Sequence, residues 1–261
     1  MNIISVDLNW APGRPRIAVA TANSQDRNIT VEGSGYDDKA FLELVRESMG
    51  TEALILLDIP IEGCHNLVAP GNSPGRGDRH FRPVDLALMR QGIWLLPASK
   101  AGSRGSALKK RLEAIAEEKK TRTTVKEIYP YAVYKFLSWL EKRGKLDSIE
   151  SGNLVRLLDD GFRRFCPNKY KRAHGQERRE AMRYLHSLLN HPQLGLSFSR
   201  LAYPHSSSNL NLLADEYDAC LGAAVGIYWA IDNPYAWVAG DSASGEVLLL
   251  ADRWLKERLR P

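Results

Sequence analysis

The chain has 261 residues, of which 44% are apolar and 26% are charged, so it is long enough to bury a hydrophobic core. These fractions are ordinary for a globular protein and exclude a fibrous or wholly disordered chain. The net charge of +5 favours a polyanionic partner but is too small to identify one.

The first third of the chain predicts an α/β arrangement. An amphipathic helix is expected over 37–49, where apolar residues recur at helical spacing. The continuous apolar run 53–57 is typical of a strand buried on both faces, and Asp58 follows it directly. Before them, three β-prone segments with turn residues between them predict a meander: 2–8, 16–21 and 28–32.

The rest of the chain alternates between a loop, a strand and several helices. Residues 62–81, rich in Gly, Pro, Asn and Arg, predict an exposed loop, and 121–129 is β-prone. A hairpin is expected over 236–251, with its turn at 241–245 and a terminal helix after it. Amphipathic patterns predict six helices: 83–91, 106–120, 131–142, 151–165, 176–189 and 209–231. With no repeat or linker to divide the chain, we expect a single domain over 1–261, with an insertion at about 62–121.

The cysteines and the N-terminal residues indicate a soluble, cytoplasmic protein. Cys64, Cys166 and Cys220 are far apart in the sequence, so we expect no disulfide framework, no disulfide-linked partner and no structural zinc site. Asp7 interrupts any apolar core of a signal peptide. No run approaches about 18 apolar residues, so we expect no membrane-spanning segment.

Five carboxylates lie where metal chemistry would use them. Asp7 lies at the end of the first strand, Asp58 follows the buried strand, and Glu127 belongs to a β-prone segment. Asp215 and Asp218 share one face of a helix that is otherwise small and apolar. Burying them is costly unless they are paired, hydrated or bound to a cation. Hard divalent cations prefer oxygen ligands, and two-metal phosphodiester chemistry needs several converging carboxylates.

Each carboxylate alone also has an ordinary explanation. Asp7 and Asp58 fit turn chemistry, Glu127 fits a solvent-facing strand position, and Asp215 fits a cap or a salt bridge. Their order along the chain is what favours a shared site. Gly222 and Gly226, on the same helix as Asp218, predict a close approach of that helix to the sheet.

Seven motifs cover almost the whole chain in a fixed order: VDLNWAP, LLDIPI, RPVD, KEIYP, KYKRAHGQERR, DEYDA and VAGDSASGEV. In this order they resemble the ribonuclease H-like superfamily and, within it, the domain-of-unknown-function 429 (DUF429) family of predicted RNase H-like nucleases. The combination of DIPI, EIYP and Asp-x-x-Asp-Ala is the specific part. In one departure, Leu8-Asn9-Trp10 stands where many superfamily members have a glycine-containing turn.

The resemblance implies an α/β fold with a five-stranded mixed sheet flanked by helices, in strand order 3-2-1-4-5. It also implies a long insertion after strand 4 and a C-terminal hairpin. The implied active site holds two Mg²⁺ or Mn²⁺ ions between Asp7, Asp58 and the helical aspartates, Asp215 or Asp218. Further motif positions are Glu127, Arg82 and Asp85.

A basic segment indicates where a nucleic acid would bind. Residues 163–183 contain eight Lys and Arg against two Glu, so they carry a net charge of +6 and the remaining residues carry −1. Interleaved aromatic residues add stacking surfaces for bases. A solvated helix face is the alternative interpretation. The candidate substrate-binding residues are Arg82, Lys169, Lys171, Arg172, Arg178 and Arg179.

The leading hypothesis is a Mg²⁺- or Mn²⁺-dependent hydrolase that cleaves DNA or RNA. One alternative is a non-catalytic protein of the same fold that binds nucleic acid or a nucleotide. Another is a small-molecule phosphotransferase or phosphatase. No Ser/His/Asp or Cys/His signature indicates a side-chain nucleophile, and His80 and His205 are candidates to protonate the leaving group.

Overall fold

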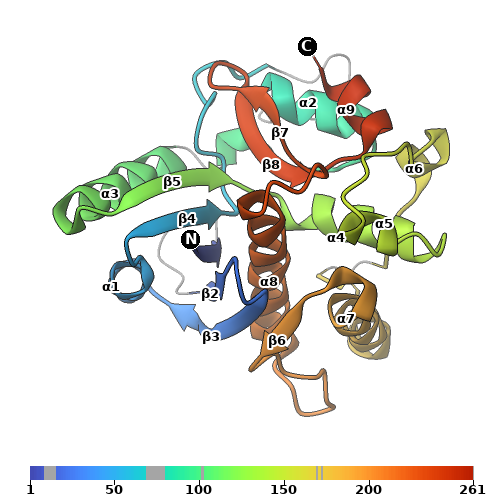
Figure 1. Cartoon of the computed structure of the whole chain (residues 1–261), viewed down its shortest axis with the longest axis horizontal. Coiled ribbons are helices and arrows are strands. Elements are labelled where there is room, and N and C mark those ends of the chain that lie inside the picture. The colour runs from blue at the N-terminus through green and yellow to red at the C-terminus, as the bar shows by residue number, and fades with distance from the viewer. Residues whose placement is uncertain (9–15, 69–79, 101–102, 169, 172, 261) are drawn as a thin grey trace.

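A six-stranded mixed sheet forms the centre of the computed structural model, which describes residues 1–8, 16–68, 80–100, 103–168, 170–171 and 173–260 (Figure 1). The order is β5-β4-β1-β2-β3-β6, so the expected order 3-2-1-4-5 is confirmed and β6 adds a sixth strand beside β3. The expected number of five strands is therefore wrong. The strands are β1 (Asn2–Asp7), β2 (Ile17–Asn23), β3 (Asn28–Tyr36), β4 (Glu52–Leu57), β5 (Arg122–Glu127) and β6 (Ser197–Ser199).

Strand direction decides which strand ends meet. β1, β2 and β3 form the antiparallel meander that the turn residues predict. β4 is parallel to β1, and β5 is parallel to β4. The carboxyl ends of β1, β4 and β5 therefore lie at one edge of the sheet, which is where ligands bind in open α/β sheets.

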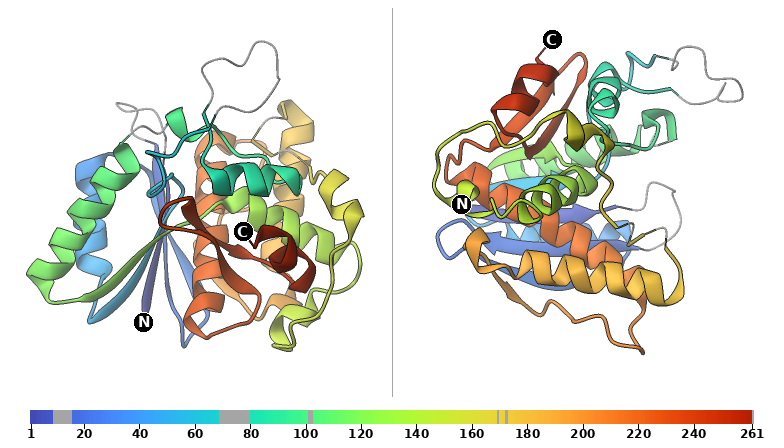
Figure 2. Two further views of the ribbon diagram at one scale, coloured as in Figure 1. Left: turned by 90° about the horizontal axis from the view of Figure 1, so that it is seen from above. Right: turned by 90° about the vertical axis from the view of Figure 1, so that its right-hand side faces the viewer.

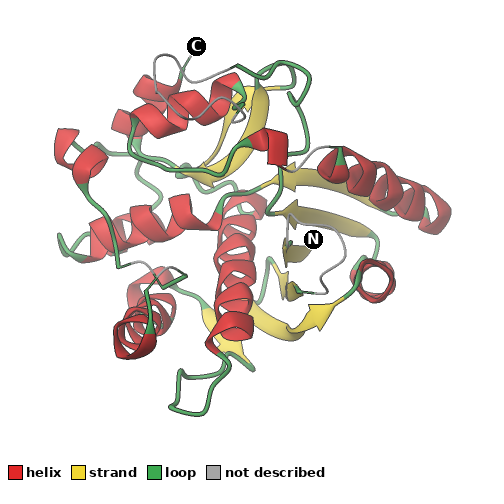
Figure 3. Cartoon of the chain, turned by 180° about the vertical axis from the view of Figure 1, so that it is seen from behind, coloured by secondary structure: helices red, strands yellow, loops and turns green. Residues whose placement is uncertain are grey.

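Helices cover both faces of the sheet (Figures 2 and 3). In β1 the side chains alternate, as they must in a strand: Ile3 packs with α8, whereas Ile4 and Val6 pack on the opposite face. The helices against the first face are α8 (Leu210–Ala230), α4 (Pro130–Glu141) and α7 (Gly175–Leu189), and those against the second are α1 (Asp38–Ser48) and α3 (Arg104–Lys119).

Helix α8 lies unusually close to the sheet. A Cβ on Gly222 would lie 2.2 Å from Ser5 Oγ, and a Cβ on Gly226 would lie 2.6 Å from Ile3 Cγ2. Both distances are too short for a side chain, so glycine is needed at both positions. The expected close approach at Gly222 and Gly226 is confirmed.

The C-terminal part packs near the end of β5. The hairpin β7 (Ala236–Asp241) and β8 (Gly245–Leu250) contacts β5, α2 (Pro83–Arg90) and α9 (Arg253–Leu259). The hairpin and its turn match the prediction, and Asp241 stabilises the turn by accepting from the amides of Ala243 and Ser244.

The helix expected over 151–165 is wrong for most of its length. The structure has the short helices α5 (Asp147–Glu150) and α6 (Asp160–Arg164), with an extended segment between them. The amides of Leu157 and Leu158 donate to Asp252 Oδ2 at 2.6 and 2.7 Å, so a side chain distant in sequence replaces the helical hydrogen bonds.

Within the described residues there are also two short 3₁₀ turns, η1 (Ala98–Lys100) and η2 (Pro192–Leu194). The three cysteines are free thiols, with Cys220 buried, Cys64 half-buried and Cys166 exposed. Among the described residues, no helix is both long enough and apolar enough to cross a membrane.

Candidate active site

The packing of α8 against β1 brings Asp7 next to Asp218. Residues 3, 5 and 7 of β1 face α8, and Gly226 and Gly222 contact the first two of them. Two residues of a strand advance about 6.7 Å, and four residues of a helix advance about 6 Å. The next step along both elements therefore pairs Asp7 with Asp218.

Asp58 reaches the same place through the parallel pairing of β1 and β4. Val6 lies opposite Leu57, and the amide of Asp58 donates to the Val6 carbonyl at 3.0 Å. Asp7 and Asp58 therefore end neighbouring strands at one edge. Carboxylate oxygens of Asp7, Asp58 and Asp218 all lie within 4.8 Å of one another.

These three carboxylates fit a hard divalent cation. All the donor atoms are oxygens, which Mg²⁺ and Mn²⁺ prefer, and their separation allows them to share one ion. Asp7 and Asp218 are buried, and Asp58 is partly buried. Carboxylates this close together and shielded from water are stable only when a positive charge compensates them or when they are protonated.

Lys171 supplies positive charge to this cluster. Its Nζ lies 3.1 Å from Asp7 Oδ2 and 3.6 Å from Asp215 Oδ1, and it also forms an ion pair with Asp218. The Lys171 side chain is 39% exposed, so it reaches the cluster from the solvent side. Its ammonium group interacts with the carboxylates that a metal ion would use.

Asp215 lies one turn before Asp218 on α8 but outside the three-carboxylate group. Arg16 Nη2 donates to Asp215 Oδ2 at 2.9 Å. Tyr170, on the other side, donates its hydroxyl to Asp218 Oδ1. Of the two aspartates that the sequence left open, Asp218 belongs to the group whose carboxylate oxygens lie within 4.8 Å of one another, and Asp215 does not.

The electrostatics of the cluster favour protonation when no cation is bound. Burial raises the pKa of Asp7 to about 7, and the neighbouring Asp218 and Asp215 add to the rise while Lys171 opposes it. Burial and the charge of Asp7 raise the pKa of Asp58 well above its usual range. Burial also raises the pKa of Asp218.

Glu127, Arg82 and Asp85 form a separate buried network. Arg82 has no exposed surface and donates to both oxygens of Glu127 at 2.6 Å and to Asp85 Oδ1 at 2.7 Å. Glu127 also accepts from the amide of Ile61, at 3.1 Å. The structure thus places Glu127 away from the carboxylate cluster and Arg82 out of reach of a substrate. The network instead connects β5, α2 and the segment that follows Asp58.

The basic segment is partly engaged within the protein. Arg178 donates to the Tyr170 carbonyl at 2.7 Å, and Arg179 donates to the carbonyls of His205 and Ser206. Lys171 contacts the cluster, and Lys169 and Arg172 lie outside the described residues, as do Asn9 and Trp10 of the first motif. The two arginines hold neighbouring segments in place and are half-buried.

The two candidate histidines do not line the cavity beside the cluster. His205 is exposed, and its ring packs against Tyr203 with 5.2 Å between centroids. The backbone amide of His80 donates to Ser99 Oγ. Neither histidine is among the residues beside Asp58 and Asp218 in this cavity.

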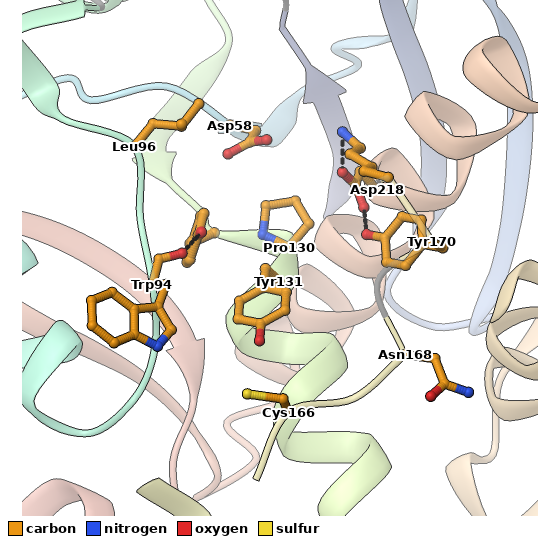
Figure 4. A pocket seen from close by; sticks show the side chains of 11 residues that line it. Asp58, Trp94, Leu96, Pro130, Tyr131, Cys166, Asn168, Tyr170 and Asp218 are labelled. Carbon is orange, nitrogen blue, oxygen red and sulfur yellow. Dashed lines mark hydrogen bonds and ion pairs between the residues drawn. The ribbon is translucent and has the colours of Figure 1, made fainter. Parts of the chain in front are cut away.

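Sequence reasoning missed the cavity next to the carboxylates. Trp94, Tyr129 and Tyr131 line it together with Asp58 and Asp218 (Figure 4). The only indication of this cavity in the sequence was that two tyrosines flank Pro130: Tyr129 within the KEIYP motif and Tyr131 directly after it. Nothing in the sequence around Trp94 distinguishes it from a core residue.

Comparison with known proteins gives little further information. No family model matches the chain, and no curated protein matches it. Among solved structures, a Thermus thermophilus RuvC structure is similar over 89% of this chain and 98% of its own, at 10% identity and a TM-score of 0.32. A likeness at this level carries no weight for function.

Proposed function

We propose that this protein is a metal-dependent nuclease that hydrolyses phosphodiester bonds of DNA or RNA in the cytoplasm, and that it belongs to the DUF429 family. The observation that carries the proposal is the convergence of Asp7, Asp58 and Asp218 within 4.8 Å at the carboxyl edge of β1 and β4. The strand order β5-β4-β1-β2-β3 supports it, because this is the order that the ribonuclease H-like resemblance implies.

Asp7, Asp58 and Asp218 would hold Mg²⁺ or Mn²⁺, with Asp215 as the candidate ligand of a second ion. When bound, such ions supply an activated water and stabilise the negative charge on the leaving 3′ oxygen. The protein's own groups keep the carboxylates in position for this. The Tyr170 hydroxyl orients Asp218, and Arg16 holds Asp215.

The position of Lys171 supports one alternative, a non-catalytic nucleic-acid-binding protein. Its ammonium group already offsets part of the negative charge of Asp7 and Asp218 with a side chain of the protein itself. In that case the carboxylates stabilise the fold and bind no metal. Metal binding therefore distinguishes the two functions.

Cleavage assays test the proposal directly. Wild-type protein with Mn²⁺ or Mg²⁺ is expected to cleave at least one of four labelled substrates: single-stranded, duplex, DNA–RNA hybrid and branched. Asp7→Asn and Asp58→Asn are expected to abolish cleavage, because each removes a charged oxygen from the metal site. Asp26→Asn, which changes an exposed turn residue, is the matched control and should cleave as wild type does. Equal behaviour of all four proteins on every substrate would contradict the assignment.

A further inference from the structure

A cavity of about 440 Å³ opens directly beside the carboxylate cluster. Asp58 and Asp218 border it at one end, and Trp94 and Tyr131 face it from the other sides (Figure 4). Its walls come from the segment after α2, from the start of α4 and from the segment before α7. The cavity and the candidate metal site therefore form one continuous surface.

The walls of this cavity are apolar and aromatic yet accessible. Trp94 is 54% exposed and Leu96 is 45% exposed, which makes them two of the few large exposed apolar side chains among the described residues. Tyr129 and Tyr131 add two rings whose centroids are 6.1 Å apart. Exposed apolar surface beside polar groups is typical of a ligand-binding site.

Hydrogen bonding holds the cavity wall in place before any ligand binds. The Tyr129 hydroxyl donates to the backbone carbonyl of Trp94, which fixes the segment after α2 against the start of α4. A preformed wall loses little conformational entropy on binding. The backbone that carries Trp94 is therefore held beside the start of α4.

The size and the aromatic lining of the cavity suit one small ligand with a flat ring. Cavities of about 300–1,000 Å³ hold ligands of small-molecule size, so 440 Å³ accommodates one nucleotide and excludes a base-paired duplex. Aromatic side chains stack on the π-face of any base with little sequence preference. A base in this cavity would place its own phosphate toward Asp58 and Asp218.

We propose that the cavity binds one unpaired nucleobase next to the phosphodiester that the carboxylate site cleaves. This inference rests on the proposed nuclease function and specifies its substrate: a single strand, or a nucleotide extruded from a duplex, in DNA or RNA. Extrusion costs least where the base is already unpaired, which favours single strands and distorted sites over continuous duplex.

Binding without metal tests this inference independently of cleavage. Fluorescence anisotropy in EDTA would measure the affinity of labelled 12-mers of oligo(dT), oligo(U) and a DNA duplex. Trp94→Ala is expected to weaken single-strand binding by about 5- to 150-fold, the range that losing one base-stacking contact implies. Trp94→Phe, which keeps an aromatic face, should stay within about threefold of wild type. Duplex binding should be unchanged in both variants.

A matched pair of exposed leucines controls for surface effects. Leu96→Ala removes a cavity side chain and should weaken single-strand binding, whereas Leu154→Ala removes an exposed leucine outside the cavity and should not. Thermal unfolding should be nearly the same for all four variants because each site is exposed. The separate oligo(dT) and oligo(U) measurements show which sugar the site prefers.

The outcomes separate this inference from the proposed function. The inference is wrong if wild type does not bind single strands, or if Trp94→Ala binds them as wild type does; cleavage with Mn²⁺ would then leave the nuclease assignment intact. Conversely, Trp94-dependent binding without cleavage in Mg²⁺ or Mn²⁺ would support the base site and overturn the nuclease assignment.

Discussion

Replacing Lys171 by methionine separates the charge of the ammonium group from the packing of its side chain. In the metal-free protein this ammonium interacts with Asp7, Asp215 and Asp218, the carboxylates that would bind a cation. A metal ion must therefore displace Lys171 or share these oxygens with it. Lys171→Met is expected to destabilise the metal-free protein and to strengthen Mn²⁺ binding.

The structure sets the size of both effects. At an effective dielectric constant of about 20, unit charges separated by the 3.1 Å between Lys171 Nζ and Asp7 Oδ2 attract by about 5 kcal/mol. The Lys171 side chain is 39% exposed, so solvent screening reduces this attraction. The net contribution falls to about 1–3 kcal/mol, as for ordinary hydrogen bonds up to those between charged groups. Because 1.4 kcal/mol corresponds to a factor of ten, Mn²⁺ should bind about 5- to 150-fold more tightly to Lys171→Met.

Isothermal titration calorimetry with Mn²⁺ at pH 8 would measure the affinity, and thermal unfolding in EDTA would measure the stability. The melting temperature of Lys171→Met should fall by about 2–10 °C without metal and recover when Mn²⁺ is added. Lys171→Arg keeps the charge, and Lys110→Met removes a charge from an exposed position on α3. An unchanged or weaker Mn²⁺ affinity in Lys171→Met would refute the idea that the ammonium competes with the metal.

Three further predictions concern stability. Gly222→Ala should lower the free energy of unfolding in urea by about 1–3 kcal/mol, because its Cβ would lie 2.2 Å from Ser5 Oγ; an unchanged midpoint would contradict the close packing of α8. Glu127→Gln should cost about 3–5 kcal/mol in the same assay, because it leaves the buried charge of Arg82 without its main partner; a loss below about 1 kcal/mol would contradict this. Burial raises the pKa of Asp7 to about 7, so the folded state keeps a proton that the unfolded state releases between about pH 4 and 7. Asp7 should therefore lower the melting temperature of the metal-free protein as pH rises through this window, whereas stabilisation by Mn²⁺ should grow with pH. A stabilisation by Mn²⁺ that decreases with pH would refute the assignment.

Much of the sheet was predictable because its signals are local. Apolar runs and turn residues located the strands of the meander and the buried β4, and the resemblance implied their order. The edge strand β6 (Ser197–Ser199) was missed because three residues carry no periodicity. The helix expected over 151–165 failed because Asp252, about 95 positions away, binds the amides of Leu157 and Leu158. The spacing of apolar residues within 151–165 cannot indicate a contact with a residue so distant in the sequence.

The candidate site was partly predictable for a related reason. Asp7, Asp58 and one of the two helical aspartates, Asp215 or Asp218, follow from strand ends and helix spacing, whereas only the structure groups Asp218 with the first two. The placement of Glu127 does not follow, because whether a carboxylate at a strand end faces a metal site or a buried arginine depends on tertiary packing. The basic residues were expected to face a substrate, but the pattern of charge does not reveal that Arg178 bonds to the Tyr170 carbonyl.

A crystal soaked in Mn²⁺, with anomalous diffraction recorded, tests the central claim most directly. The account predicts an anomalous peak bonded to oxygens of Asp7, Asp58 and Asp218, with the Lys171 ammonium displaced from them. A map without a peak between these carboxylates at saturating Mn²⁺, with Lys171 still paired to Asp7 and Asp218, would contradict it.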